Sequence, residues 1–460
     1  MNTYAKFMRE AKSMAGNEIH RAKIKKAITS YEIQVDGMKK QQFQDWNAAR
    51  EVAAGIKNEV LANLPEMLQE FEEKLTSRGA TVLWAENAEQ ARHYIEEIIS
   101  RHNARKVVKS KSMTTEEIEL NEYLESRGIE NWESDLGELI VQLADEKPYH
   151  IVTPAMHKSK QEIARLFVEK LGIEYTENAE ELTMAARAHL RRAFVTADIG
   201  ITGANFIIAE EGAIVMTENE GNGRLGMACP KVHIAIAGIE KMLPRLADLS
   251  LFLPLLTTSG TGQQLTGYNS IVRGPKSAAE PDGPEEMIVI LLDNGRSNIY
   301  AQDHFREVLR CIRCGACLNA CPVFRSVGGH TYATTYQGPV GSIITPQLRG
   351  MAAWQHLAHA CSLCGACTEV CPVGIDLHPL LLETRWQADK EHAASKKWQF
   401  AIKMWSKIIP SRKVIDTFRP LMKIFLPLAK PFLSANQKKR IPTMAKKSFA
   451  QMWENNESTR

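Results

Sequence analysis

Two cysteine-rich stretches hold the residues of this 460-residue chain whose types and spacing are best suited to chemistry. The first reads CIRCGACLNACP, from Cys311 to Pro322, and the second reads CSLCGACTEVCP, from Cys361 to Pro372. Eight of the nine cysteines lie in these stretches, and both follow the spacing C-x2-C-x2-C-x3-C-P. Four thiolates at this spacing suit the iron corners of a [4Fe–4S] cube. The repeat therefore predicts two such clusters close together, which is typical of an electron-transfer module.

The fourth cysteine of each run is expected to bind the cluster of the other run, as in two-cluster ferredoxins. Small residues such as Gly315 and Gly365 let the backbone approach each cube closely. Zinc is the alternative, but structural zinc favours two separated C-x2-C pairs. The first cluster is predicted to be held by Cys311, Cys314, Cys317 and Cys371. The second cluster is predicted to be held by Cys361, Cys364, Cys367 and Cys321.

The composition is that of an ordinary soluble chain, with 44% hydrophobic and 24% charged residues. The N-terminal stretch MNTYAKFMREAKSMAG has no apolar core of a secretory signal, and no run of eighteen apolar residues occurs. We therefore expect a cytoplasmic location, where clustered cysteines favour metal ligation over disulfides. The isolated Cys229 is expected to be a small buried side chain, with a reactive thiol as the alternative.

Apolar runs and helix signals divide the chain into four predicted parts. Residues 1–70 are predicted to be helical, and residues 71–300 alternate strands with helices, which favours an α/β domain with a largely parallel sheet. Within that domain YHIVTPA is expected to be a strand, and Thr114 with Glu117 fits a helix capping box. Residues 301–390 contain the cysteine runs, joined by the loop-like HTYATTYQGPVGSIITP. Residues 391–460 form a basic end.

Two loops of the α/β part carry weaker signals. The segment from Lys109 to Ser112 joins a strand to a helix, so its lysines, serines and free helix amides either bind an anion or form a solvated loop. His157 and Lys158 would join such a site if the strand ends meet. GNGRLG matches G-x-G-x-x-G at Gly221, Gly223 and Gly226, but a dinucleotide site needs a helix directly after it. A tight turn is predicted there, with a ligand loop of another type as the alternative.

The basic end carries fifteen Lys and Arg against four Asp and Glu. Such a segment can touch acidic lipid head groups, dock an acidic partner, or cover the cysteine module. No fold motif supports nucleic acid as a partner. Its aromatic and apolar residues alternate with lysines: Trp398, Phe400, Ile402, Trp405 and Ile408 among Lys397, Lys403 and Lys407.

Four segments together resemble the bacterial lactate-utilisation iron–sulfur protein B family: VVKSKSMTTEEIELNEYLESRG, DIGITGANFIIAEEGAIVMTENEGNGR, DGPEEMIVILLDNGRSNI and CIRCGACLNACPVFRSVGGHTY. The resemblance implies an α/β lactate-utilisation domain, similar to sugar-isomerase and CoA-transferase-like folds, followed by an α-helical ferredoxin module with two [4Fe–4S] clusters. It also implies an electron-transfer role in oxidising L-lactate to pyruvate together with companion proteins.

Two functional hypotheses follow. In the first, the chain carries electrons and depends on partners for the lactate chemistry, because no convincing flavin or nicotinamide site is present. In the second, the chain itself oxidises a 2-hydroxy acid, in a pocket formed beside one cluster by the loops VVKSKS, GITGAN and GNGRLG.

Overall fold

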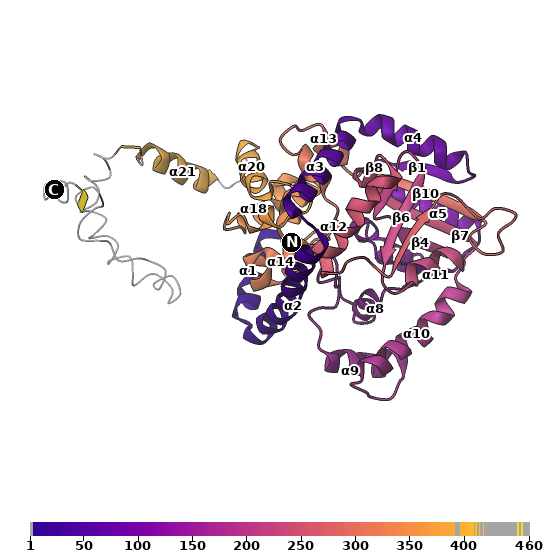
Figure 1. The fold of residues 1–460 in the computed structure, drawn as a ribbon. Helices are drawn as coiled ribbons and strands as arrows, with labels where there is room; N and C mark the ends of the chain where they lie inside the picture. The colour runs from indigo at the N-terminus through magenta and orange to yellow at the C-terminus, as the bar shows by residue number, and fades with distance from the viewer. Residues whose placement is uncertain are drawn as a thin grey trace. The chain divides into compact units, whose positions relative to one another are not determined.

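The computed structural model describes residues 3–391 and 396–408, together with the isolated positions 410, 411, 414, 417, 449, 452 and 453. The chain divides into two units, residues 1–391 and residues 392–460. The first unit contains all the strands of the described residues (Figure 1). Every cysteine also lies in this unit.

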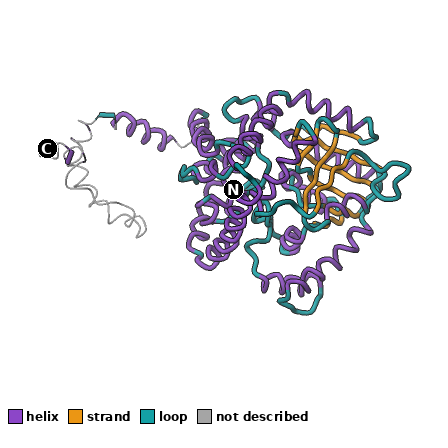
Figure 2. Tube along the Cα trace, in the orientation of Figure 1, coloured by secondary structure: helices purple, strands orange, loops and turns teal. Residues whose placement is uncertain are grey.

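A six-stranded sheet forms the centre of the α/β part, and its strands gather on one side of the first unit (Figure 2). The strand order is β1-β10-β7-β4-β2-β3, and every neighbouring pair is parallel. The predicted parallel sheet is therefore confirmed. Its strands are β1 (Thr81–Ala85), β2 (Lys106–Lys109), β3 (Glu130–Glu133), β4 (Ile199–Gly203), β7 (Val232–Gly238) and β10 (Glu286–Leu292).

Both faces of this sheet are buried, which explains the nearly continuous apolar runs of its central strands. Successive side chains of a strand point to opposite faces. Ile234 and Ile236 therefore pack with α5 and α7, while Ala235 and Ala237 pack with α4. The helices on these faces are α4 (Leu64–Thr76), α5 (Ala88–Arg101) and α7 (Leu120–Ser126).

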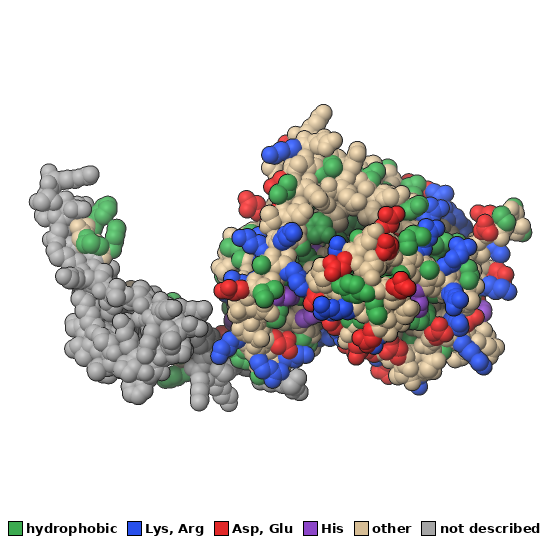
Figure 3. Space-filling model, turned by 90° about the horizontal axis from the view of Figure 1, so that it is seen from below, with side chains coloured by type: hydrophobic (Ala, Val, Ile, Leu, Met, Phe, Trp, Pro, Cys, Tyr) green, Lys and Arg blue, Asp and Glu red, His purple; other side chains and the backbone are tan. Residues whose placement is uncertain are grey.

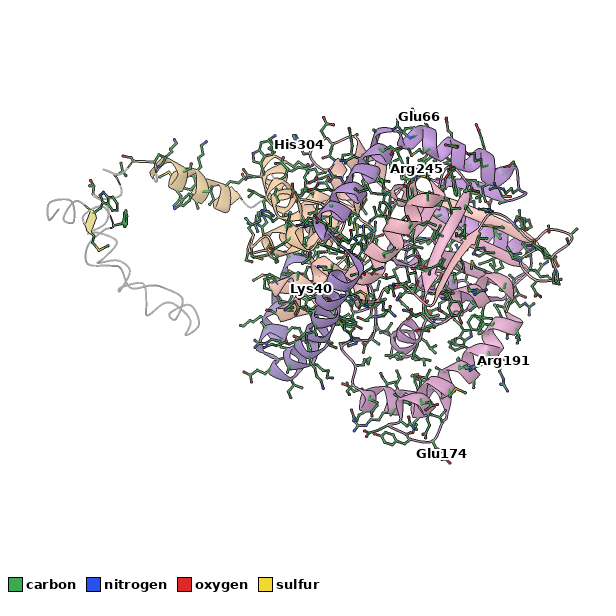
Figure 4. The ribbon with its side chains drawn as sticks, in the orientation of Figure 1. Lys40, Glu66, Glu174, Arg191, Arg245 and His304 are labelled. Carbon is green, nitrogen blue, oxygen red and sulfur yellow. The ribbon has the colours of Figure 1, made fainter. Side chains whose placement is uncertain are left out.

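A smaller sheet of order β8-β5-β6-β9 adjoins the first. Its strands are β5 (Phe206–Ile208), β6 (Ala213–Glu218), β8 (Met242–Leu243) and β9 (Tyr268–Val272). β5 and β6 pair antiparallel around the Glu-Glu-Gly segment. Further helices are α6 (Met113–Glu117), α8 (Leu136–Leu143), α9 (Lys160–Leu171), α10 (Ala179–Thr196), α11 (Asn222–Ala228), α12 (Leu249–Thr261) and α13 (Arg296–Tyr300). Glu174 and Arg191, labelled in Figure 4, are exposed on the α9–α10 hairpin.

The cysteine-rich part is helical, as predicted. Its elements are η3 (Arg306–Arg310), α14 (Ala316–Ala320), α15 (Pro322–Val327), η4 (His330–Tyr332), α16 (Gly338–Arg349), α17 (Met351–Trp354), α18 (His356–His359), α19 (Ala366–Glu369) and α20 (Leu377–Lys390). The prediction of a loop between the cysteine runs is wrong from Gly338 onward, where α16 begins. Pro339 lies in the first turn of α16, where no backbone N–H is needed, and Pro346 is accommodated inside the helix.

The N-terminal helices pack on this cysteine-rich part (Figure 1). They are α1 (Thr3–Gly16), α2 (Glu18–Gln42) and α3 (Trp46–Ala62). Phe7 of α1 and Ile28 of α2 belong to the same buried cluster as Leu318 and Leu377. The N-terminal segment is therefore part of the core around the cysteines, although its boundary near residue 70 stays a prediction.

Two local predictions in the α/β part are wrong. The segment YHIVTPA is irregular: His150 Nδ1 accepts the backbone N–H of Val152 at 3.1 Å, and the segment packs against Gly315 in the first cysteine run. The cap of α6 is Ser112, whose Oγ accepts the N–H of Thr115 at 3.3 Å, and not Thr114.

The described part of the second unit contains the helix α21 (Lys396–Ile408). Phe400 and Trp405 are exposed on it. Most of the predicted basic end lies outside the described residues. None of the described helices combines the length and the apolar character needed to cross a membrane. Acidic and basic side chains are interspersed over the face of the first unit seen from below (Figure 3).

Candidate electron-transfer site

The two cysteine runs fold into loops of the same shape. Arg313 and Leu363, which precede the second cysteine of each run, have φ values of 62° and 55°. Gly315 and Gly365, which follow it, have φ values of 80° and 82°. A short helix, α14 or α19, begins directly after each glycine. Left-handed backbone on both sides of a cysteine makes a tight turn. Each run therefore curls around a space that its own thiols border.

The thiols gather in two sets, and all of the cysteines are free of disulfides. Cys371 of the second run interacts electrostatically with Cys311 and Cys314 of the first. In the same way Cys321 of the first run interacts with Cys361 and Cys364 of the second. Each set combines three thiols of one run with the last thiol of the other. The sets are Cys311, Cys314, Cys317 and Cys371, and Cys321, Cys361, Cys364 and Cys367.

The surroundings of these thiols fit ligands of the positively charged iron atoms of a cluster. Burial raises the pKa of Cys371 to about 11 and that of Cys367 to about 12, because isolated thiolates are poorly solvated there. Bound iron would remove that cost, since a coordinating thiol is deprotonated. Backbone N–H groups also point at sulfur: Arg313 N lies 3.4 Å from Cys311 Sγ, and Leu363 N lies 3.3 Å from Cys361 Sγ. Such amides stabilise thiolates and cluster sulfides.

Buried cations surround the first set. Lys57 is 1% exposed, and its ammonium donates to the carbonyl oxygens of Glu240 and Met242 at 2.7 and 3.0 Å. Burial lowers the pKa of Lys57 to about 7 and that of Lys241 to about 8, while the nearby Cys311 opposes both shifts. Arg313, whose charge is attracted by Cys311, pairs with Glu240 at 3.0 Å. An added electron at this set would therefore meet the positive charge of Arg313 and would favour the protonated forms of Lys57 and Lys241.

An ion network beside the first set connects the α/β part to the cysteine module. Arg296, which is 1% exposed, lies 2.7 Å from Glu117 Oε2 and 2.5 Å from Glu240 Oε2. The hydroxyl of Tyr336, just before α16, donates to Glu117. Burial alone would raise the pKa of Glu240, but Arg296 and Arg313 lower it to about 2. No local sequence pattern predicts this network, because its members come from four separate segments.

The second set lies nearer the surface. Cys364 is exposed, whereas no cysteine of the first set is. The guanidinium of Arg385 donates to the carbonyl oxygen of Cys361 at 2.7 Å. The two sets therefore differ in both exposure and the number of nearby cations.

The residues of the predicted anion-binding loop, Lys109 to Ser112, differ in their surroundings: two make internal contacts and two line a cavity. Lys109 is fully buried and pairs with Glu133 at 2.6 Å and with Glu116 at 3.6 Å, so its charge is neutralised within the protein. Ser112 caps α6. Ser110 and Lys111 line a cavity. His157 and Lys158 do not join them, because both contact Glu146.

The helix N-terminus within the G-x-G-x-x-G motif is not free to bind a phosphate. A helix, α11, begins inside it at Asn222, which differs from the predicted tight turn. The amides of Gly223 and Arg224 donate to Glu218 at 2.6 and 2.8 Å, so the protein's own carboxylate occupies the helix N-terminus. Cys229 at the end of α11 is exposed, and the expectation that it is buried is wrong.

The three loops VVKSKS, GITGAN and GNGRLG meet in one cavity of about 660 Å³, as the sequence predicted. Lys111, Asn205 and Asn222 line it from these loops. Arg313 and Cys314 of the first cysteine run also line it. The cavity therefore adjoins the first thiol set.

Comparison with known proteins agrees with this architecture. Residues 68–292 match the LUD domain, and residues 307–375 match the 4Fe-4S dicluster domain. The chain is 43% identical over 387 residues to the "Uncharacterized electron transport protein YkgF" of Escherichia coli, which covers 83% of this chain and 81% of that protein. It is 45% identical over 365 residues to "Lactate utilization protein B" of Bacillus subtilis, which covers 79% of this chain and 76% of that protein. The chain therefore belongs to the family of these proteins, in which a LUD domain precedes a 4Fe-4S dicluster domain.

Proposed function

We propose that this chain is an iron–sulfur electron-transfer subunit in the oxidation of L-lactate to pyruvate, which allows growth on lactate and requires companion proteins. The observation that carries the proposal is the pair of thiol sets, each made of three cysteines of one run and the last cysteine of the other. Each set would hold one [4Fe–4S] cluster, a carrier of single electrons. Lactate use is inferred from the relatives that are named for it.

The arrangement suggests a direction for the electrons. The first set, of which Cys314 and Cys371 are buried, lies beside Lys57, Lys241 and Arg313, whose protonated side chains stabilise added negative charge. The second set reaches the surface at Cys364, where a companion protein can approach. We infer that electrons pass between a donor on the cavity side and a partner at Cys364.

The proposal is tested by anaerobic purification followed by iron and sulfide analysis and EPR of the reduced protein. We expect about eight irons per chain and the signals of two interacting cubes. Oxidation of lactate by the chain mixed with its companions should then reduce these clusters. Bound zinc, or thiols that titrate as free, would contradict the proposal.

At pH 6, below the pKa of about 7 of Lys57, Lys57→Met should lower the reduction potential of one cluster only. A unit charge about ten ångströms away contributes roughly 1–2 kcal/mol at an effective dielectric constant of 20, which corresponds to tens of millivolts. The measurement is an EPR-monitored redox titration of the full chain. Lys106→Met is the matched control, because the half-exposed Lys106 at the start of β2 pairs with Glu130. Equal shifts in the reduction potentials of both clusters would contradict the proposed position of Lys57 beside the first cluster.

The second candidate function is oxidation of a 2-hydroxy acid by this chain itself. The observation that favours it is the cavity bordered by Cys314. Turnover of L-lactate by the purified chain with an artificial acceptor, without companions, would support this candidate. Activity that appears only after companions are added would support the subunit role.

We also infer a cytoplasmic location with contact to the inner face of the membrane. Exposed Phe400 and Trp405 lie among Lys403 and Lys407 on α21, an arrangement that suits an anionic lipid surface. Sedimentation with anionic vesicles tests this contact, and equal sedimentation with neutral vesicles would contradict it.

A further inference from the structure

The cavity beside Cys314 lies where an open parallel sheet is expected to bind ligands. From β2 the chain continues to β3 on one side, and from β4 it later reaches β7 on the other side. The carboxyl ends of β2 and β4 are therefore a topological switch point, where a crevice forms between diverging connections. Ser110, directly after β2, and Gly203, at the end of β4, line the cavity.

One wall of the cavity offers donors for an anion. Among the described residues, Ser110 Oγ has no hydrogen-bond partner although Ser110 is 5% exposed. Lys111 donates to the carbonyl oxygen of Val152 at 3.0 Å and lies 3.4 Å from Asp135, which leaves further donor capacity on its ammonium. Burial lowers the pKa of Lys111, but Asp135, Glu138 and Glu220 together raise it above its usual value, so the ammonium stays charged. Within the described structure Arg313 Nε and Nη1 are likewise buried without partners.

Three carboxylates line the cavity beside these donors: Asp135, Glu218 and Glu220. Asp135 offsets part of the charge of Lys111, and Glu218 accepts two helix amides, whereas Ser110 Oγ stays available as a donor. Glu220 is exposed, but partial desolvation and the nearby charge of Asp135 raise its pKa toward neutrality, so it can exchange its proton near neutral pH. A hydroxyl group beside Glu220 would therefore have a proton acceptor within the same cavity.

We propose that this cavity binds a small 2-hydroxycarboxylate, with the carboxylate at Ser110 and Lys111 and the hydroxyl toward Glu220. The site is larger than such a ligand needs, and the amide side chains of Asn205 and Asn222 on its wall suit a polar ligand. Because Cys314 borders the cavity, the ligand lies beside the first proposed cluster. The choice of L-lactate as the ligand rests on the proposed function.

The experiment is calorimetric titration of the anaerobically purified full chain, with its clusters in place, with L-lactate. We expect saturable binding, and a change in the EPR signal of one reduced cluster and not of the other. Lys111→Met should weaken binding at least tenfold, because it removes a charged hydrogen-bond donor. Ser110→Ala should weaken binding several-fold and leaves folding intact, because it removes a buried hydroxyl that has no partner.

Lys106→Met at the opposite end of β2 is the matched control and should bind L-lactate normally. Propionate, which lacks the hydroxyl, should bind at least tenfold more weakly, and so should inorganic phosphate. The inference is overturned if L-lactate gives no binding, if Lys111→Met binds like wild type, or if propionate or phosphate binds equally well. A chain with intact clusters but no lactate binding would refute this site alone, whereas a chain without clusters would refute the proposed function.

Discussion

Cys371→Ala should remove the same cluster as Cys314→Ala, although the two cysteines lie in different runs. Both thiols belong to the first set, and a cube that loses one of four ligands is destabilised. We expect iron to fall from about eight to about four per chain in each variant, with the same EPR signal remaining. Cys321→Ala and Cys367→Ala should each remove the second cluster and leave the EPR signal of the first.

Cys229→Ala is the matched control for these variants. Its thiol is exposed and belongs to neither set, so iron content and both EPR signals should be unchanged. The assignment of Cys371 to the cluster of the other run is wrong if the EPR signal of Cys371→Ala resembles that of Cys367→Ala more closely than that of Cys314→Ala.

Arg296→Met should destabilise the protein by about 3–5 kcal/mol, because it leaves two buried carboxylates without their shared partner. Glu117 and Glu240 both contact Arg296, and all three side chains are almost completely buried. Equilibrium unfolding of the full chain in urea measures the loss. The variant should also recover stability at acidic pH relative to wild type, because protonation of Glu117, which has lost its ion-pair partner, removes its buried charge, whereas Glu240 keeps Arg313.

Arg245→Met is the control for this change. Arg245, labelled in Figure 4, has a half-exposed side chain that pairs with Asp248, and Asp248 also accepts the backbone N–H of Arg245. Because the guanidinium is solvated, its removal should cost much less stability than removal of Arg296. A similar loss of stability in Arg296→Met and Arg245→Met would show that burial does not explain the contribution of the Arg296 network to stability.

The sequence predicted the features that depend on short-range spacing. The two cysteine runs, each eleven residues long, adopt the same loop geometry because the same small residues flank the same thiols, as at Gly315 and Gly365. The strands β7 and β10 were predictable because both of their faces are buried and their sequences are almost entirely apolar. Two of the loops that meet in the cavity, VVKSKS and GITGAN, were predictable because they end the neighbouring parallel strands β2 and β4, whereas GNGRLG follows β6 of the smaller sheet.

Features that depend on distant contacts were not predictable. The segment from Tyr149 to Ala155 has the composition of a strand, but its packing against the loop at Gly315 makes it irregular. The Arg296 network depends on Glu117, which is 179 residues away in the chain. Helix α16 was missed because its glycines and prolines, which usually indicate loops, lie where the helix tolerates them.

The packing of the N-terminal helices on the cysteine module has a consequence for the order of biosynthesis. Phe7 and Ile28 leave the ribosome long before Leu318 and Leu377, with which they share a buried core. These apolar faces must stay without their partners until almost all of the first unit has been translated. Iron insertion at the cysteines is therefore expected to follow completion of the chain, and a fragment that starts near residue 301 should be insoluble.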